Sequence, residues 1–204
     1  MQRFDSEDIK EMVHILKEDG VLLVPTDTVF GVCARMGSKQ ALENMRKVKN
    51  RPKEKAFPLM CSSLQQMESI AYIDEESKAI IEAFMPGPLT LIVKKKEEVE
   101  EYVNGGKETL ALRMATSDTL KEMIEELGEP IFMSSANQSG EDACMNVEDA
   151  SRACPLAEGI LVGEVSYAKA STIIDATNQF QIVREGPIVK EDIVNVLKEK
   201  EDAR

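Results

Sequence analysis

Helix-like segments alternate with short apolar runs along most of the chain. Apolar residues recur at helical spacing from Ile9 to Leu16, and Gly20 is a helix-ending residue. Residues 21–24 follow at once as a short apolar run closed by Pro25, which is typical of a buried strand. Because this alternation continues to the end of the chain, it predicts an α/β fold in which helices cover an open sheet.

The other elements follow from the same patterns. Further helices are expected over residues 38–48, 64–70, 77–84 and 117–127 and from Glu191 onward, and strands over residues 57–61, 89–93, 109–114, 131–133, 159–162, 172–175 and 180–184. Helix N-caps are expected at Ser6 or Asp5, at Ser38, and at Ser117 or Asp118. The charged run over residues 94–101 is interpreted as a solvated loop.

The length and the N-terminal sequence indicate the number of domains and the cellular location. Its 204 residues fit one domain with a substantial core, and we expect a single domain over residues 1–204. No run approaches the roughly 18 apolar residues of a membrane helix, and MQRFDSEDIK lacks the apolar segment of a signal peptide. These features predict a cytoplasmic protein that does not associate with a membrane.

Chemistry based on histidine or on paired cysteines does not fit this sequence. The cysteines at positions 33, 61, 144 and 154 form no CxxC pair, so neither a zinc knuckle nor a dithiol motif is supported, and reduced thiols are expected. His14 is the single histidine and falls within the first helical pattern, which argues against a histidine-based triad or metal site. We therefore expect no metal site formed by protein side chains.

Basic residues are concentrated in one segment of an acidic chain. Residues 35–55 hold eight Lys and Arg against two Glu, a local charge of +6 in a chain of −12. Nucleic-acid binding usually needs a broad basic surface, so one basic island suits a small polyanion better. Three of these cations are interpreted as solvated helix-face charges: Lys39, Arg46 and Lys47. Lys49 and Arg51, beside a proline, are interpreted as functional.

Polar side chains gather in three predicted loops. Residues 25–31 read Pro-Thr-Asp-Thr-Val-Phe-Gly, residues 49–55 carry the cations, and residues 134–140 begin Ser-Ser-Ala-Asn. Each loop taken alone could be an ordinary turn or helix cap. Cations and directed donors together are what a nucleoside triphosphate requires, and loops at strand ends are where open α/β sheets bind ligands.

In this order the motifs resemble the YrdC family of threonylcarbamoyl-AMP synthases over nearly the whole chain. The matched elements are Pro-Thr-Asp-Thr-Val-Phe-Gly at 25–31 (with Phe30 for the family's tyrosine), Lys-x-Arg-Pro at 49–52, Pro-Gly-Pro-x-Thr at 86–90, the flanked Arg113, Ser-Ala-Asn at 135–137, Ser-Thr-Ile-Ile-Asp at 171–175 and Arg-x-Gly at 184–186. The resemblance implies a YrdC-like α/β fold: an open, twisted, mixed and parallel sheet flanked by helices, with a concave cationic face.

The activity implied by the resemblance is that of an ATP-dependent L-threonylcarbamoyladenylate synthase, a nucleotidyltransferase. L-threonine, bicarbonate and ATP would give threonylcarbamoyl-AMP and pyrophosphate for the t6A modification of tRNA. Mg²⁺ would accompany ATP. The implied partners are RNA or tRNA, double-stranded RNA included, and the proteins that transfer the threonylcarbamoyl group.

The resemblance also implies roles for particular residues. The catalytic tetrad around the phosphates would be Lys49, Arg51, Ser135 and Asn137. ATP would contact Arg51, Lys55, Thr109, Ser135 and Arg184. L-threonine would contact Thr28, Arg113 and Ser171.

Departures from the family pattern keep other functions open. Many members carry a histidine soon after Lys-x-Arg-Pro, whereas residues 56–61 read Ala-Phe-Pro-Leu-Met-Cys. This segment and Phe30 favour a YciO-like RNA- or nucleotide-binding protein without synthase activity. The intact Lys-x-Arg and Ser-Ala-Asn elements favour a synthase. Carbamoyl-transferring relatives of the hydrogenase-maturation type are much larger chains. The chain ends soon after residues 184–186, so we expect that the C-terminal domain of the longer synthases is absent.

Overall fold

The computed structural model describes residues 1–167 and 169–202. The strands are β1 (Gln2–Phe4), β2 (Leu22–Pro25), β3 (Phe30–Arg35), β4 (Leu59–Cys61), β5 (Ala71–Tyr72), β6 (Leu89–Lys95), β7 (Thr109–Met114), β8 (Ile131–Ser135), β9 (Gly159–Leu161), β10 (Thr172–Asp175) and β11 (Gln181–Arg184). The helices are α1 (Ile9–Lys17), α2 (Lys39–Lys49), α3 (Leu64–Ile70), α4 (Glu75–Phe84), α5 (Glu101–Asn104), α6 (Asp118–Leu127), α7 (Val147–Ala153) and α8 (Lys190–Asp202).

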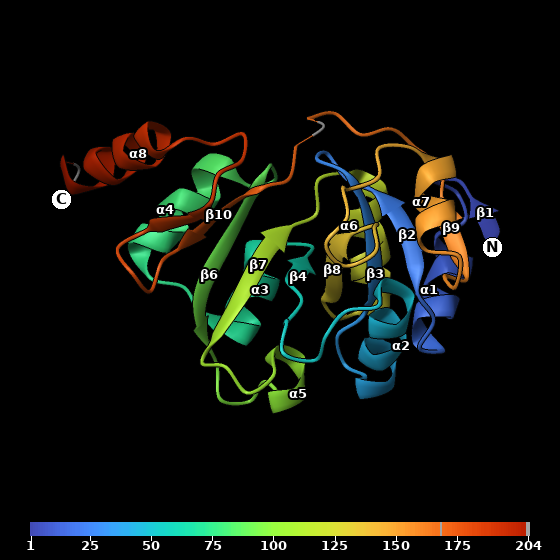
Figure 1. Ribbon diagram of the computed structural model, residues 1–204. Helices are drawn as coiled ribbons and strands as arrows, with labels where there is room; N and C mark the ends of the chain where they lie inside the picture. The colour runs from blue at the N-terminus through green and yellow to red at the C-terminus, as the bar shows by residue number, and fades with distance from the viewer. Residues whose placement is uncertain (168, 203–204) are drawn as a thin grey trace.

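One mixed sheet runs through the described part of the molecule (Figure 1). Its order is β1-β9-β2-β3-β8-β4-β7-β6-β10-β11, and β5 pairs with β6. The sheet contains parallel pairs such as β4–β7 and β6–β10 as well as antiparallel pairs such as β2–β3 and β3–β8. The predicted open α/β sheet of mixed strands is thus confirmed.

Side-chain alternation along the strands divides the interior into two cores. On β2, Leu22 and Val24 pack with α1 and α6, while Leu23 points to the opposite face, where α2 packs. On β6, Leu89 and Leu91 belong to that second core. Thr90, between them, is directed to the other face. This alternation places Thr90 and Ile92 in the lining of a cavity on that face.

Two of the three predicted helix N-caps agree with the structure. Ser38 and Ser117 accept hydrogen bonds from the first turns of α2 and α6, which confirms both predicted caps. The cap expected at Ser6 or Asp5 is wrong, because α1 begins at Ile9 with Asp8 at its N-cap and has no side-chain cap bond. Asp5 instead accepts the backbone N–H of Glu7.

Some elements were not anticipated. The segment after Pro25 was interpreted as a loop, but Phe30–Arg35 forms β3, which pairs with both β2 and β8. The loop expected over residues 94–101 is shorter, since β6 extends to Lys95 and α5 begins at Glu101. Among the helices that the structure describes, none has the length and apolar character needed to cross a membrane.

Candidate functional site

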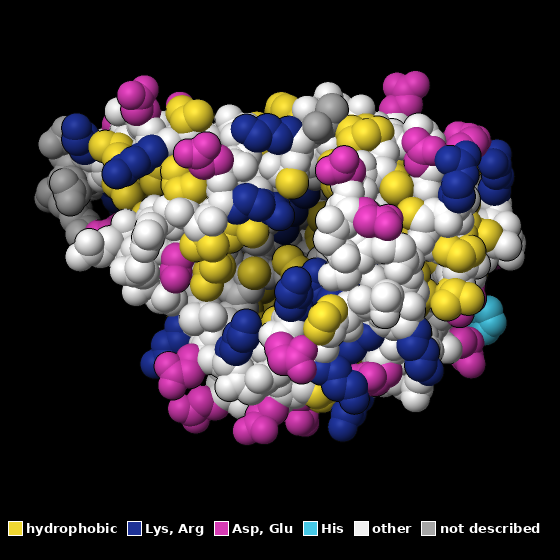
Figure 2. Space-filling view, viewed as in Figure 1, with side chains coloured by type: hydrophobic (Ala, Val, Ile, Leu, Met, Phe, Trp, Pro, Cys, Tyr) yellow, Lys and Arg dark blue, Asp and Glu magenta, His cyan; other side chains and the backbone are white. Residues whose placement is uncertain are grey.

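A cavity of about 560 Å³ opens over strands β6, β7 and β10 and reaches the ends of β2 and β8. Its volume lies within the range typical of small-molecule sites. Dark blue Lys and Arg side chains lie in and around the central hollow in the space-filling view (Figure 2). The cavity therefore offers room and positive charge for an anionic ligand.

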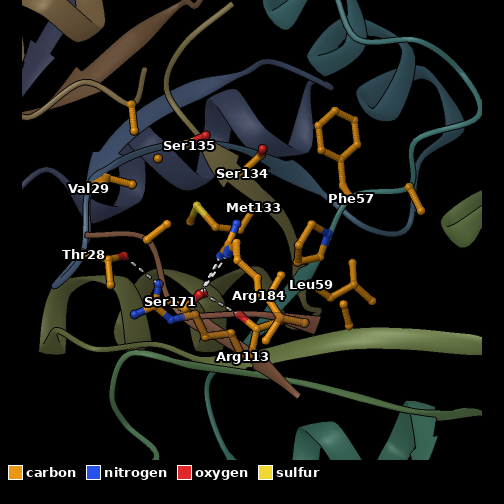
Figure 3. A pocket seen from close by; sticks show the side chains of 18 of the residues that line it. Thr28, Val29, Phe57, Leu59, Arg113, Met133, Ser134, Ser135, Ser171 and Arg184 are labelled. Carbon is orange, nitrogen blue, oxygen red and sulfur yellow. Dashed lines mark hydrogen bonds between the residues drawn. The ribbon is translucent and has the colours of Figure 1, made fainter. Parts of the chain in front are cut away.

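Eight of the ten predicted site residues line this cavity: Thr28, Arg51, Thr109, Arg113, Ser135, Asn137, Ser171 and Arg184. They come from segments far apart in sequence, and five of them are labelled in the close view of the cavity (Figure 3): Thr28, Arg113, Ser135, Ser171 and Arg184. Lys49 and Lys55 are not part of the lining. The Lys55 side chain is exposed, and its carbonyl accepts hydrogen bonds from Arg51 and Arg46.

Lys49 lies beneath the loop that follows β8. It is the last residue of α2 and is 1% exposed. Its ammonium donates to the carbonyls of Ser135 and Asn137 and, at 3.0 Å, to Asn137 Oδ1. An ammonium has three hydrogens, and all three are used here. Lys49 thus holds the loop from below.

The loop's own polar groups are also mutually bonded. Ser135 Oγ donates to Asn137 Oδ1 at 2.5 Å, and Asn137 Nδ2 donates to the carbonyls of Gln138 and Glu141. Gln138 Nε2 donates to the carbonyls of Val48 and Ala153 and so joins the loop to α2 and α7. Residues 135–138 thus form a hydrogen-bonded loop, here called the shelf, at one side of the cavity.

Burial lowers the pKa of Lys49 to about 8. The Cys154 and Cys144 side chains oppose this shift, and the Arg51 guanidinium adds to it. The ammonium therefore remains the main form at neutral pH, and it loses its proton in mildly alkaline solution.

Arg51 keeps several donors directed at the cavity. Its Nε and Nη2 donate to the carbonyls of Lys55 and Ala56, and its guanidinium lies 4.7 Å from the centroid of the Phe57 ring. Five N–H groups are present on a guanidinium, so three remain without a partner among the described residues. Burial, with the nearby Arg46, lowers the pKa of Arg51.

Arg46 corrects one expectation. It was interpreted as a solvated charge, but its side chain is buried and packs 5.5 Å from the centroid of the Phe57 ring. It donates to the carbonyls of Pro52 and Lys55. Arg46 and Arg51 together fix the segment after α2. Lys39 and Lys47 are exposed, as expected.

Arg113, on β7, is held by the hairpin between β2 and β3. It forms an ion pair with Asp27, donates to Thr28 Oγ1 at 2.9 Å, and contacts the Gly87 carbonyl through Nε and Nη2. One Nη1 hydrogen remains without a partner among the described residues. Burial lowers the pKa of Arg113, and Asp27 opposes that shift. The guanidinium is thus preoriented, with one N–H left for a ligand.

Ser171 and Arg184 form a second polar group at the C-terminal strands. Arg184 donates through Nε and Nη2 to the Ser171 carbonyl and through Nη2 to Ser171 Oγ, as the dashed lines in Figure 3 mark. Burial lowers the pKa of Arg184, and so does the positive charge of Arg113. The two guanidiniums are therefore close enough for an anion between them to relieve their repulsion.

Some lining residues were not predicted. Thr90, Pro58 and Met133 also border the cavity. Thr90 lies in the Pro-Gly-Pro-x-Thr element, which was matched to the family but given no role. Pro58 stands in the segment that lacks the family's histidine. Of these three residues, only Thr90 lay in a motif from which a place in the site could have been predicted.

Oxygen ligands for a metal ion are few. Among the described residues, no group of three or more His, Cys, Asp or Glu side chains could hold a metal ion. Glu141 and Asp142 are exposed carboxylates in the cavity lining. Such carboxylates suit Mg²⁺, which is usually held by one or two of them together with substrate phosphates.

Comparisons with known proteins give a consistent result. The Sua5/YciO/YrdC family model, described as telomere recombination, matches residues 14–186. A threonylcarbamoyl-AMP synthase from Aliivibrio fischeri is 36% identical over 148 residues, which is 70% of this chain and 79% of the relative. One from Vibrio parahaemolyticus is 32% identical over 187 residues, which is 88% of this chain and 100% of the relative.

Solved structures agree with these relatives. Sua5 from P. abyssi complexed with L-threonine superposes with a TM-score of 0.89 at 28% identity, covering 96% of this chain and 60% of the other. YciO from E. coli superposes with a TM-score of 0.82 at 25% identity, covering 91% of this chain and 96% of the other. The chain thus spans 60% of the P. abyssi protein and nearly all of YciO.

Proposed function

The chain belongs to the Sua5/YciO/YrdC family, and on that premise we propose that it is a threonylcarbamoyl-AMP synthase. It joins L-threonine, bicarbonate and ATP, releases pyrophosphate, and serves the t6A modification of tRNA. The observation that carries the proposal is the single cavity that eight of the ten predicted residues line. The threonylcarbamoyl-AMP synthase from Vibrio parahaemolyticus, which is matched over its whole length, supports it.

The reaction needs positioning and charge neutralisation more than a nucleophilic side chain. The threonine amine and bicarbonate give a carbamate and water. A carbamate oxygen then bonds to the α-phosphorus of ATP while the bond to the bridging oxygen breaks and pyrophosphate leaves. Because charge moves onto phosphate oxygens, fixed cations and donors are the groups that lower the barrier.

Arg51 is the residue that we assign to the phosphates. Its three remaining N–H groups are available at the cavity wall, whereas those of Lys49 are all used by the shelf. Lys49 then acts by holding Ser135 and Asn137 in place and by adding positive charge from below. Thr109 and Arg184 complete the nucleotide side of the cavity, while Lys55 contributes through its backbone.

L-threonine is assigned to the neighbouring part of the cavity, and Arg184, which is hydrogen-bonded to Ser171, lies between the two ligand positions. Thr28, Arg113 and Ser171 line this part, and Arg113 keeps one N–H without a partner among the described residues. An amino-acid carboxylate is the natural partner for that N–H. Mg²⁺ would arrive with ATP and neutralise part of the phosphate charge, and Glu141 and Asp142 would share in holding it. Contacts with tRNA and with transfer proteins also belong to this proposal.

A YciO-like role without synthase activity is the second candidate. The YciO structure is similar over nearly its whole length. However, the Lys-x-Arg and Ser-Ala-Asn elements are intact and form one bonded shelf. The more similar curated relatives are named synthases. These observations favour synthesis over binding alone.

Pyrophosphate release tests the proposal. With ATP and Mg²⁺ present, release should require both L-threonine and bicarbonate, because the carbamate that they form is the attacking group. Each component is left out in turn, with D-threonine as a stereochemical control. ATP cleavage that ignores threonine, or that yields ADP, would contradict the synthase assignment.

The Arg113→Lys variant tests the part of the cavity assigned to the amino acid. Lysine keeps the charge but loses the planar fork that now meets Asp27, Thr28 and Gly87. We expect threonine affinity to fall about tenfold or more, with ATP affinity within about twofold of normal. Calorimetric titration of each ligand separately measures this. Equal losses for both ligands would show that Arg113 does not discriminate between them.

A further inference from the structure

One buried oxygen atom of a residue in the cavity lining has no hydrogen-bond partner. Asn104 is the last residue of α5, lines the cavity and is only 2% exposed. Its side-chain nitrogen, Nδ2, donates to the carbonyls of Lys107, at 2.5 Å, and Thr109, at 2.9 Å. Within the part of the chain that the structure describes, no donor reaches its side-chain oxygen, Oδ1. A buried acceptor of this kind is costly unless a ligand supplies the donor.

The same two carbonyls fix which way the amide of Asn104 faces. A carbonyl oxygen only accepts hydrogen bonds, so both carbonyls must meet the NH₂ group of the amide and not its oxygen. Turning the amide over would place Oδ1 against two carbonyl oxygens and would lose both bonds. At this position the side chain therefore offers an acceptor, and it cannot turn to offer a donor in its place.

A second buried oxygen without a partner shows the contrast. Asp27 Oδ2 also accepts no hydrogen bond among the described residues. However, the carboxylate of Asp27 is already paired with Arg113 through Oδ1, and Asp27 is not part of the cavity lining. The protein itself thus accounts for the buried carboxylate of Asp27, whereas it offers nothing to Asn104 Oδ1.

Strand β7 places Asn104 at the end of the cavity away from Arg113. Thr109, whose carbonyl holds Asn104, begins β7, and Arg113 is four residues further along the strand. At a rise of about 3.3 Å per residue, these two positions are about 13 Å apart. Thr109, Ala111 and Arg113 are alternate residues on one face of β7, and all three line the cavity. Asn104 therefore lies far from the guanidinium that we assign to the amino-acid carboxylate.

The floor of the cavity between these two ends is apolar. Ala111 is paired with Ile92 on β6, and Pro58 directly precedes β4, the strand on the other side of β7. All three residues line the cavity. An apolar floor with a fixed acceptor at its end suits a planar ring that carries an amino group. Adenine is such a ring, with its amino group at C6.

The amine of threonine does not suit this acceptor. In an amino acid the amine and the carboxylate are attached to the same carbon atom. A threonine whose carboxylate is bound by Arg113 therefore keeps its amine near Arg113, at the opposite end of β7 from Thr109. The nucleobase is the part of the two substrates that can extend to Asn104.

We propose that Asn104 Oδ1 accepts a hydrogen bond from the C6 amino group of adenine and thereby makes the cavity select ATP over GTP. Guanine carries a carbonyl oxygen at C6, where adenine carries the amino group. That oxygen would face Oδ1, and the amide is held so that it cannot turn and donate to it. The inference rests on the proposed function, since it takes the nucleotide of that reaction as the ligand.

Nucleotide analogues test this acceptor in the unaltered protein. The wild type is titrated calorimetrically, with Mg²⁺ present, with ATP, with GTP, and with purine riboside triphosphate, which has a hydrogen in place of the amino group. We expect purine riboside triphosphate to bind about tenfold more weakly than ATP, and GTP about 10²-fold more weakly. Equal affinities for ATP and purine riboside triphosphate would overturn the inference and leave the proposed function standing.

The Asn104→Ala variant separates recognition of the base from support of the loop. The variant loses Oδ1 and also both bonds to the loop carbonyls, so the informative quantity is the ratio of the affinities for ATP and purine riboside triphosphate. This ratio should fall from about ten to about one. L-threonine affinity should not change. Thermal melts check the fold, and should the variant not fold, the wild-type series still decides.

Asn44→Ala is the matched control. Asn44, on α2, also donates through its side chain to a backbone carbonyl, that of Asp19, but it is not part of the cavity lining. Its affinity ratio should equal that of the wild type.

Two results in Asn104→Ala would also overturn the inference. An affinity ratio equal to that of the wild type would assign the C6 amino group to another acceptor and leave Asn104 as a support of its loop. Loss of L-threonine affinity with normal ATP affinity would assign Oδ1 to the amino acid. A wild type that binds no ATP would instead overturn the proposed function, and this inference with it.

Discussion

Replacing Lys49 with methionine is expected to lower pyrophosphate formation by about 10²-fold or more, although the fold is retained. Methionine fits the length of the buried side chain but donates no hydrogen bond. The carbonyls of Ser135 and Asn137 and the Asn137 Oδ1 would then lose their common donor. The shelf would shift, and displacement of about 1 Å is enough for losses of this size.

Stability should change much less than activity in this variant. The Ser135 carbonyl still accepts from the Asn137 N–H, and Asn137 Oδ1 still accepts from Ser135 Oγ. The Asn137 carbonyl is therefore the acceptor left unpaired, at a cost of about 1–3 kcal/mol. The shift in the pKa of Lys49 from 10.5 to about 8 means that burying its charge already costs about 3 kcal/mol, which methionine removes. The two effects oppose each other. Denaturant unfolding should therefore show a change in the free energy of unfolding of at most about 2 kcal/mol.

The pH dependence of ATP affinity separates Lys49 from other groups. Because the pKa of Lys49 is lowered to about 8, the ammonium is lost as pH rises above that value. Wild-type ATP affinity should fall there, while that of the Lys49→Met variant should stay flat. Unchanged turnover in the variant, or equal pH profiles for both proteins, would contradict a role for the Lys49 charge in ATP binding.

Replacing Arg51 with alanine should also lower kcat/KM by about 10²-fold or more, equivalent to about 3 kcal/mol of transition-state stabilisation. Arg51 is the member of the tetrad whose N–H groups remain available in the cavity. Lys47→Ala removes an exposed cation on α2, four residues before Arg51; it is the matched control and should be nearly normal.

A second variant identifies what Arg51 contributes. Arg51→Lys keeps the charge but loses the fork and the contact with the Phe57 ring, so only partial recovery is expected. Steady-state pyrophosphate assays and thermal melts would measure both variants. Near-normal kcat/KM in Arg51→Ala, with the melt unchanged, would contradict the phosphate assignment.

Local patterns predicted the fold where each element carries its own signal. The bounds of α3, β7 and β10 are those expected from the sequence, because apolar spacing marks them clearly. By contrast, β3 lies in a segment interpreted as a loop, and it owes its conformation to pairing on both sides. The short helix α7 buries only Val147 and Ala150, which leaves little periodic signal.

The motifs predicted eight residues that line the cavity, but not the hydrogen-bond network around them. Spacing and motif gave Lys49 as a cation for phosphates, yet its acceptors lie 86 and 88 positions away along the chain. Only the folded chain brings them together and uses every ammonium hydrogen. Likewise, Thr90 was in a matched motif, but its partner Ser171 is 81 positions away.

The fate of bicarbonate tests the central claim most directly. The protein is incubated with ATP, Mg²⁺, L-threonine and isotopically labelled bicarbonate, and the nucleotide products are identified by mass spectrometry. The account predicts an adduct of AMP and threonine that carries the label, formed mole for mole with pyrophosphate. An unlabelled threonyl adenylate, or ADP in place of pyrophosphate, would contradict it.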